Sequence, residues 1–261
     1  MTDTIASFAL RDAGADGVAL ALARCYHEYS LWHGQATVIA GFAEDASAAG
    51  VKKIIANRMR EAFDFALAEG VIATSAPLGN DLLNQLTEHE IATAHHGGRI
   101  AAIVMMHSAC ERFLWRMVRF GLVSNRAKGL TWIADRKISV KALEKQTPEL
   151  AIDEQLEKWW DELNRDTLVR KWDCLVGLVG FPPKLDDGRW HFDREMLGRF
   201  DEVRHNAVHH DAQEVKAFGF IEFARQLLRA QLVWLVYIGQ RLRLKLPGEV
   251  VFLGSIPASP Q

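Results

Sequence analysis

The residues best suited to chemistry lie in one short segment, Arg204-His205-Asn206-Ala207-Val208-His209. Histidine titrates near neutrality and acts as a general acid or base, whereas arginine presents a planar set of donors that matches phosphoryl oxygens. In RNA the ribose 2′-hydroxyl is a built-in nucleophile, so its attack on phosphorus needs a proton acceptor and charge stabilisation but no metal ion. His209 and Arg204 supply these two residue types, and phosphodiester cleavage is therefore one interpretation of the segment.

Two other interpretations of the segment stay open. His205 and His209 are four residues apart and share a helical face, so with His210 they could ligate the metal of a hydrolase. Alternatively, Arg and His side chains in the last turn of a helix simply complement its macrodipole. No third ligand is evident on the helical face that His205 and His209 share, because Asp201 is equally placed to pair with Arg204. We expect neither a metal nor a cofactor.

Several familiar kinds of site are excluded by the sequence. The chain contains no P-loop, no Gly-rich dinucleotide fingerprint, no H-E-x-x-H and no G-x-S-x-G. Cys25, Cys110 and Cys174 form no C-x-x-C pair, which argues against a zinc knuckle and favours a reducing, cytoplasmic compartment. Charged residues interrupt every long apolar run, so we expect no membrane span and no signal peptide.

The elements that must position the segment are expected to be helices. Periodic apolar residues without any strand-turn-strand series predict an all-α protein. We expect a kink or boundary at His95-His96-Gly97-Gly98, a helix start at Pro148, a short extended piece at 189–192 and an N-cap at Asp193. The ranges expected to be helical are, in chain order, 13–42, 47–69 with Gly70 as its cap, 81–94, 99–121, 153–178, 193–209 and 221–244.

The pattern predicts three regions. Residues 1–94 are expected to form an N-terminal helical extension, 95–246 an up-down bundle of four or five helices, and 247–261 a tail. We expect the tryptophans of these helices to act as packing anchors rather than as stacking platforms for bases, namely Trp115, Trp159, Trp160 and Trp172.

A formal charge of −2 conceals a basic stretch. Between Arg99 and Lys145, ten Lys or Arg residues accompany three Asp or Glu. Arg112, Arg116 and Arg119 lie largely off the apolar stripe of their helix, so they are candidates for contacts with an RNA backbone. The alternative is an ordinary solvated helix face.

The segment from Phe200 to His209 resembles the signature of HEPN domains, which is Arg-x4-6-His near the end of a helix with a polar residue after the Arg. His205 fills the polar position, and Asn206 follows one place later. The segment Met105-Met106-His107-Ser108-Ala109-Cys110-Glu111-Arg112-Phe113-Leu114 is similar to the first bundle helix of that family. The resemblance covers residues 95–246 and includes the final amphipathic helix.

Membership of that family would imply a four- or five-helix bundle, a homodimer that brings two motifs together, and metal-independent endoribonuclease activity that leaves 2′,3′-cyclic phosphate ends. His209 would transfer protons, Arg204 would bind the scissile phosphate, and His205 and Asn206 would position them. Apart from the resemblance, Glu111 lies beside the apolar stripe of its helix, where it could pair with Arg204 or simply occupy a boundary face. Such proteins act as toxins or defence effectors, often restrained by an antitoxin or regulatory protein. Other members have lost catalysis and bind nucleotides, RNA or proteins, which is the alternative function.

Overall fold

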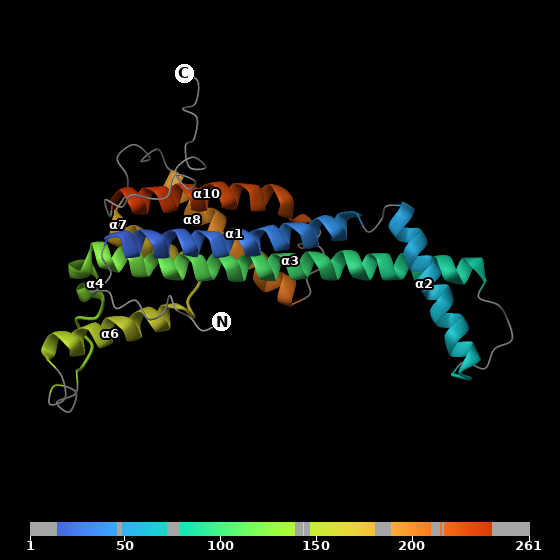
Figure 1. Ribbon diagram of the computed structural model, residues 1–261, viewed down its shortest axis with the longest axis horizontal. Helices are drawn as coiled ribbons and strands as arrows, with labels where there is room; N and C mark the ends of the chain where they lie inside the picture. The colour runs from blue at the N-terminus through green and yellow to red at the C-terminus, as the bar shows by residue number, and fades with distance from the viewer. Residues whose placement is uncertain are drawn as a thin grey trace, which may run out of the picture. The chain divides into compact units, whose positions relative to one another are not determined.

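The computed structural model describes residues 15–45, 49–71, 79–138, 143, 147–180, 189–209, 215 and 217–241. All regular elements in these ranges are helices, which confirms the all-α prediction (Figure 1). They are α1 (Ala15–Asp45), α2 (Ala49–Ala68), α3 (Asn80–Ser124), α4 (Arg126–Trp132), α6 (Pro148–Leu163), α7 (Leu168–Val179), α8 (Arg189–Val208) and α10 (Phe220–Arg241). None of the helices in the described ranges is both long and apolar enough to traverse a bilayer.

The chain forms two compact units, each assembled from separate stretches of sequence. The first comprises Met1–His33, Met106–Glu202 and Arg225–Gln261, and the second comprises Gly34–Met105 and Val203–Ala224. The helices α1, α3, α8 and α10 therefore contribute residues to both units. The expected tail at 247–261 lies outside the described residues.

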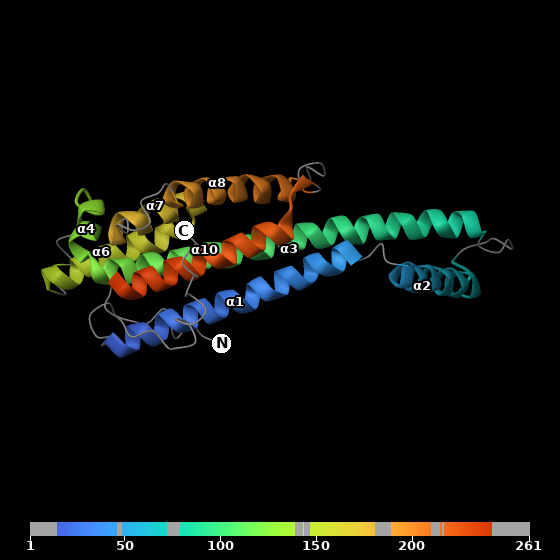
Figure 2. The same ribbon diagram turned by 90° about the horizontal axis from the view of Figure 1, so that it is seen from above.

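The first unit has its core around the carboxyl-terminal part of α3. Phe113 and Leu114 of α3 are buried, and the ring of Tyr29 from α1 lies 5.3 Å from that of Phe113. Trp172 of α7 packs against Trp234 of α10, with ring centroids 4.5 Å apart. Figures 1 and 2 show α1, α3 and α10 running side by side. The amino-terminal part of α1 thus contributes to the core of this unit.

In the second unit, the run His95-His96-Gly97-Gly98 does not end a helix. α3 continues through it from Asn80 to Ser124, so the predicted boundary there is wrong. A Cβ atom on Gly98 would lie 2.7 Å from the Cβ of Ala43 in α1. Glycine at this position permits two helices to approach closely rather than breaking one of them.

The end of α2 was predicted correctly. Gly70 has a φ of +69°, a conformation that glycine adopts without strain. Its N–H donates to the carbonyl of Leu67 at 3.2 Å, and the N–H of Val71 donates to that of Ala66 at 2.9 Å. These two bonds satisfy carbonyls that the end of the helix would otherwise leave without donors.

The helix predicted over 153–178 is in fact two helices. α6 begins at Pro148, as expected, with the Thr147 hydroxyl accepting the N–H of Leu150 at 3.4 Å. The chain turns after Leu163, and α7 begins behind a second cap, in which the Thr167 hydroxyl accepts the N–H of Arg170 at 3.2 Å. Threonine caps therefore set both starts, and the second one interrupts an otherwise helical pattern.

α8 begins earlier than the sequence suggested. Arg189–Phe192 is helical rather than extended, and Asp193 lies inside the helix instead of capping it. The Asp193 carboxylate is buried and accepts a hydrogen bond from the indole Nε1 of Trp234 at 2.9 Å. The other end is as predicted, because α8 ends at Val208 and His209 completes its last turn.

Candidate active site

The carboxyl-terminal part of α8 separates buried from exposed side chains by helical spacing. Phe200, Val203 and Ala207 are buried at intervals of three and four residues. Arg204, His205 and His209 are exposed. Asn206 is half-buried at the edge between the two faces. The buried side chains anchor the helix, and the same periodicity turns the functional candidates toward solvent.

The two imidazoles of the motif lie against each other. The ring centroids of His205 and His209 are 4.3 Å apart, with an angle of 53° between the planes. The N–H of His209 donates to the carbonyl of His205 at 3.0 Å, so the final turn holds both residues. The two imidazoles therefore lie in contact in an open position at this end of α8.

Arg204 brings a cation to the same turn. It is exposed, and within the described residues no hydrogen bond or ion pair occupies its guanidinium. Positions five residues apart on a helix are separated by about 140° around the axis, so Arg204 and His209 do not share a face. The structure pairs His205 with His209 but does not pair either imidazole with Arg204.

Asp201, the alternative partner for Arg204, is bound elsewhere. One carboxylate oxygen lies 2.8 Å from Nε2 of His107 in α3, and the other accepts the backbone N–H of Leu168 at 3.1 Å. Leu168 is the first residue of α7, where the helix dipole favours a negative charge. Asp201 therefore joins α8 to α3 and α7, and neither pairs with Arg204 nor joins the histidines of the motif.

Glu111 also has a different partner from the one expected. Its Oε1 accepts a hydrogen bond from Nζ of Lys171 at 3.0 Å, and the Lys171 side chain is fully buried. The same ammonium donates to the carbonyl of Asn164 at 3.0 Å and to that of Asp166. All three donors of the buried ammonium are thereby used at the turn between α6 and α7. Glu111 therefore compensates a buried charge in the core, and the partner that the structure gives it is Lys171.

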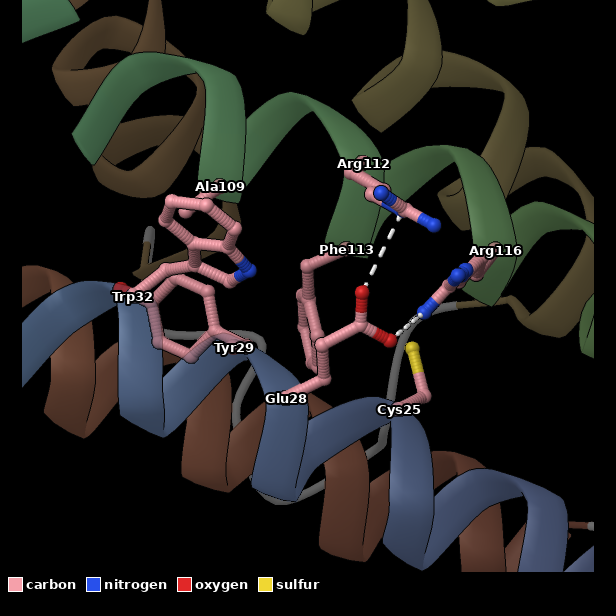
Figure 3. A pocket seen from close by; sticks show the side chains of 8 residues that line it. All are labelled: Cys25, Glu28, Tyr29, Trp32, Ala109, Arg112, Phe113 and Arg116. Atoms are coloured by element: carbon pink, nitrogen blue, oxygen red, sulfur yellow. Dashed lines mark hydrogen bonds and ion pairs between the residues drawn. The ribbon is translucent and has the colours of Figure 1, made fainter. Parts of the chain in front are cut away.

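Two of the three arginines expected to bind RNA flank Glu28 of α1 (Figure 3). Arg116 is buried and forms an ion pair with Glu28, and Nε of Arg112 lies 3.5 Å from the same carboxylate. Burial alone would lower the pKa of Arg116, but the hydrogen bond and charge of Glu28 raise it above its usual value. The pocket beside this cluster has room for about one water molecule, which is too small for a nucleotide.

Arg119, the third of these arginines, lies in a different packed cluster. Its guanidinium donates to Glu157 at 2.9 Å and lies 4.4 Å from the ring centre of Trp160. Trp160 stacks on Trp115 at 3.8 Å, and each indole N–H donates to the other residue's backbone carbonyl at 2.8 Å. The expected role of these tryptophans as packing anchors is confirmed, and Arg119 belongs to the same contact between α3 and α6.

Sequence reasoning missed the polar residues that organise the first unit. Besides Lys171 and His107, Gln231 is buried and donates to the Cys110 sulfur at 3.2 Å. The sequence does contain a signal for Lys171, which interrupts the buried stripe of α7 between Leu168 and Leu175. A charge at a core position implies a buried partner, although it does not identify one.

The surroundings of the motif show no preformed metal site in the part of the chain that the structure describes, where no three His, Cys, Asp or Glu side chains converge. His210, the third ligand of the metal interpretation, lies outside that part. The chain matches no protein-family model, no curated protein and no solved structure.

Proposed function

We propose that the exposed end of α8 is the active site of a metal-independent endoribonuclease. One observation carries the proposal: Arg204, His205 and His209 are exposed together at a helix end, with the two imidazoles in contact. Within the described residues no carboxylate neutralises Arg204. An accessible cation beside accessible proton-transfer groups is the combination that phosphodiester cleavage requires.

In the proposed reaction, the imidazole of His209 takes the proton of a ribose 2′-hydroxyl. The 2′-oxygen then forms a bond to the adjacent phosphorus, and the bond from phosphorus to the 5′-oxygen breaks. A protonated imidazole from the motif of a second copy gives its proton to the leaving 5′-oxygen. The products carry a 2′,3′-cyclic phosphate and a 5′-hydroxyl, so the step consumes neither water nor an oxidant.

The remaining residues of the motif have supporting roles in this proposal. Arg204 binds the non-bridging oxygens of the phosphate, whose negative charge grows in the transition state. His205 restricts the orientation of His209 through the ring contact, and Asn206 positions the end of the helix. A second copy completes the site, because Arg204 and His209 of one chain lie on different faces of α8. We further propose a toxin or defence role for this activity, restrained by an antitoxin or regulatory protein in the cytoplasm.

The proposal is tested by incubating the purified full chain with structured and single-stranded RNA in EDTA. We expect cleavage by the wild type and loss of cleavage in His209→Ala and Arg204→Ala. Arg199→Ala and His27→Ala are the matched controls, because both residues are exposed and lie outside the motif. Product 3′ ends that resist ligation until the cyclic phosphate has been opened and removed to leave a free 3′-hydroxyl would support 2′-hydroxyl attack.

Two results would overturn this assignment. Cleavage that survives both motif substitutions would place the activity elsewhere, and cleavage that EDTA abolishes would favour a metal-dependent hydrolase.

A catalytically inactive binding module is the second candidate function. The observation that favours it is the internal pairing of Arg116 and Arg119, which removes two cations from the expected RNA path. In this case the protein would bind RNA, a nucleotide or a helical protein without cutting RNA. Binding of labelled RNA without any cleavage, weakened by Arg204→Ala but not by Arg199→Ala, would support the binding module over the nuclease.

A further inference from the structure

Helix α2 of the second unit buries little of its side-chain surface. Of its side chains that the structure describes, none is buried, although Ile55, Met59 and Phe63 on one side are half-buried. Lys52 forms an ion pair with Glu88 of α3. A helix of this length gains most of its stability from burying an apolar face. The arrangement in one chain therefore leaves α2 with only one partly covered side.

The opposite side of α2 carries a regular surface, which we call the α2 face and define as Ile54, Arg58, Glu61 and Phe65. These residues follow one another at intervals of four, three and four, so they form one stripe along the helix. Ile54 is 56% exposed and Phe65 is 67% exposed. Arg58 and Glu61 are also exposed, and neither forms an ion pair with another described residue. Two large apolar side chains thus flank two opposite charges.

The order of these residues is symmetric about the middle of the stripe. The pair Ile54 and Phe65 and the pair Arg58 and Glu61 have the same midpoint, between positions 59 and 60. In two identical antiparallel helices related by a two-fold axis at that point, each residue faces the one equally far on the other side. Ile54 of one copy then meets Phe65 of the other, and Arg58 meets Glu61, each contact occurring twice.

We propose that the α2 face is a self-association surface on which two copies of this chain dock antiparallel. The charges select this arrangement, because a parallel pair in register would bring Arg58 against Arg58 and Glu61 against Glu61. Contact between Ile54 of one copy and Phe65 of the other buries apolar surface that α2 leaves exposed in a single chain. This inference does not rest on the proposed nuclease activity, since it uses no residue of the motif.

The test reverses the charge of Arg58 or of Glu61 and measures dimerisation of the full chain by analytical ultracentrifugation over a wide concentration range. We expect the wild type to dimerise, and Arg58→Glu or Glu61→Arg each to weaken dimerisation roughly tenfold or more, because either change puts two like-charged pairs in contact. Arg60→Glu is the matched control, since Arg60 is an exposed arginine of the same helix outside the α2 face. It should leave dimerisation unchanged.

Mixing the two weakened variants provides the decisive measurement. One copy then carries Glu at positions 58 and 61 and the other carries Arg at both, so antiparallel docking restores two attractive pairs. We expect a heterodimer in the mixture and a restored homodimer in the double variant R58E/E61R. An ion pair between Arg58 and Glu61 of the same helix would not produce a heterodimer in the mixture, so this result separates contact between two copies from contact within one helix.

Three results would overturn the proposal, provided that circular dichroism shows the variants to be folded. These are a wild type that remains monomeric at all concentrations, a dimer that neither charge reversal weakens, and a mixture that does not associate. If the charge variants prove unfolded, Phe65→Ser, which removes one apolar side chain of the α2 face, replaces them. A Phe65→Ser variant that dimerises as tightly as the wild type would also overturn the proposal.

Discussion

Helix α8 carries two groups of polar residues whose surroundings are opposite. Asp193 and Asp201 each meet a specific donor from another helix, Trp234 in one case and His107 in the other. The motif residues Arg204, His205 and His209 are exposed, and the only contact that the structure shows among these three side chains joins the two imidazoles. The first group holds helices together, and the second is available to a ligand. Substitutions in the two groups should therefore affect different properties.

The largest effect is expected for the motif. Replacing His209 with alanine should lower RNA cleavage about 10²–10⁴-fold, because a positioned general acid or base contributes that much. The melting temperature should stay within about 1 °C of the wild type, since an exposed side chain with no buried partner adds little stability. Initial cleavage rates check the expected loss of activity, and thermal unfolding of the same preparation checks the expected melting temperature. A large loss of stability with little change in rate would place His209 with the structural residues.

The next largest effect concerns the buried lysine. Glu111→Gln removes the carboxylate that compensates the Lys171 ammonium and should cost about 2–3 kcal/mol of unfolding free energy. Lys171→Met should cost less, about 1 kcal/mol, because it removes the buried charge and leaves a partly exposed glutamate that water can solvate. Urea unfolding of both variants tests this order. If Lys171→Met is the more damaging change, the carbonyls of Asn164 and Asp166 are the more important partners of the ammonium.

A smaller effect is expected for Asp201→Asn. The amide keeps the shape of the side chain but loses the negative charge that faces the start of α7 and His107, which should cost about 1–2 kcal/mol. RNA cleavage at a temperature where the variant is folded should stay near the wild-type rate. Loss of cleavage without loss of stability would instead assign Asp201 to the active site and remove the contrast within α8.

The sequence predicted best what depends on neighbours in the chain. The end of α8 follows from local helical spacing, as does the cap at Gly70. The Thr167 cap was missed because buried apolar residues recur at helical intervals on both sides of it, so periodicity alone continued the helix through it.

The sequence could not predict which distant residues meet. Glu28 and Arg116 are separated by 88 positions, and Glu111 and Lys171 by 60. Helical periodicity indicates which face of α3 is apolar, but it does not say which helix covers the other faces. The basic stretch was therefore interpreted as a surface for RNA, whereas carboxylates of α1 and α6 neutralise part of it.

The smallest effect is a pH dependence from Glu157, the partner of Arg119. Burial raises the pKa of this carboxyl, and the nearby Arg119 only partly opposes the change. The folded protein then binds this proton more tightly than the unfolded chain, so the contribution of Glu157 to stability falls as the pH rises from its ordinary value of 4.5 to its raised folded value. The difference in unfolding free energy between wild type and Glu157→Gln, measured in urea at several pH values, should decrease over this range and then level off. An increase over the same range would mean that the attraction of Arg119 outweighs burial, and the cluster around Trp160 would then be held together by charge more than by packing.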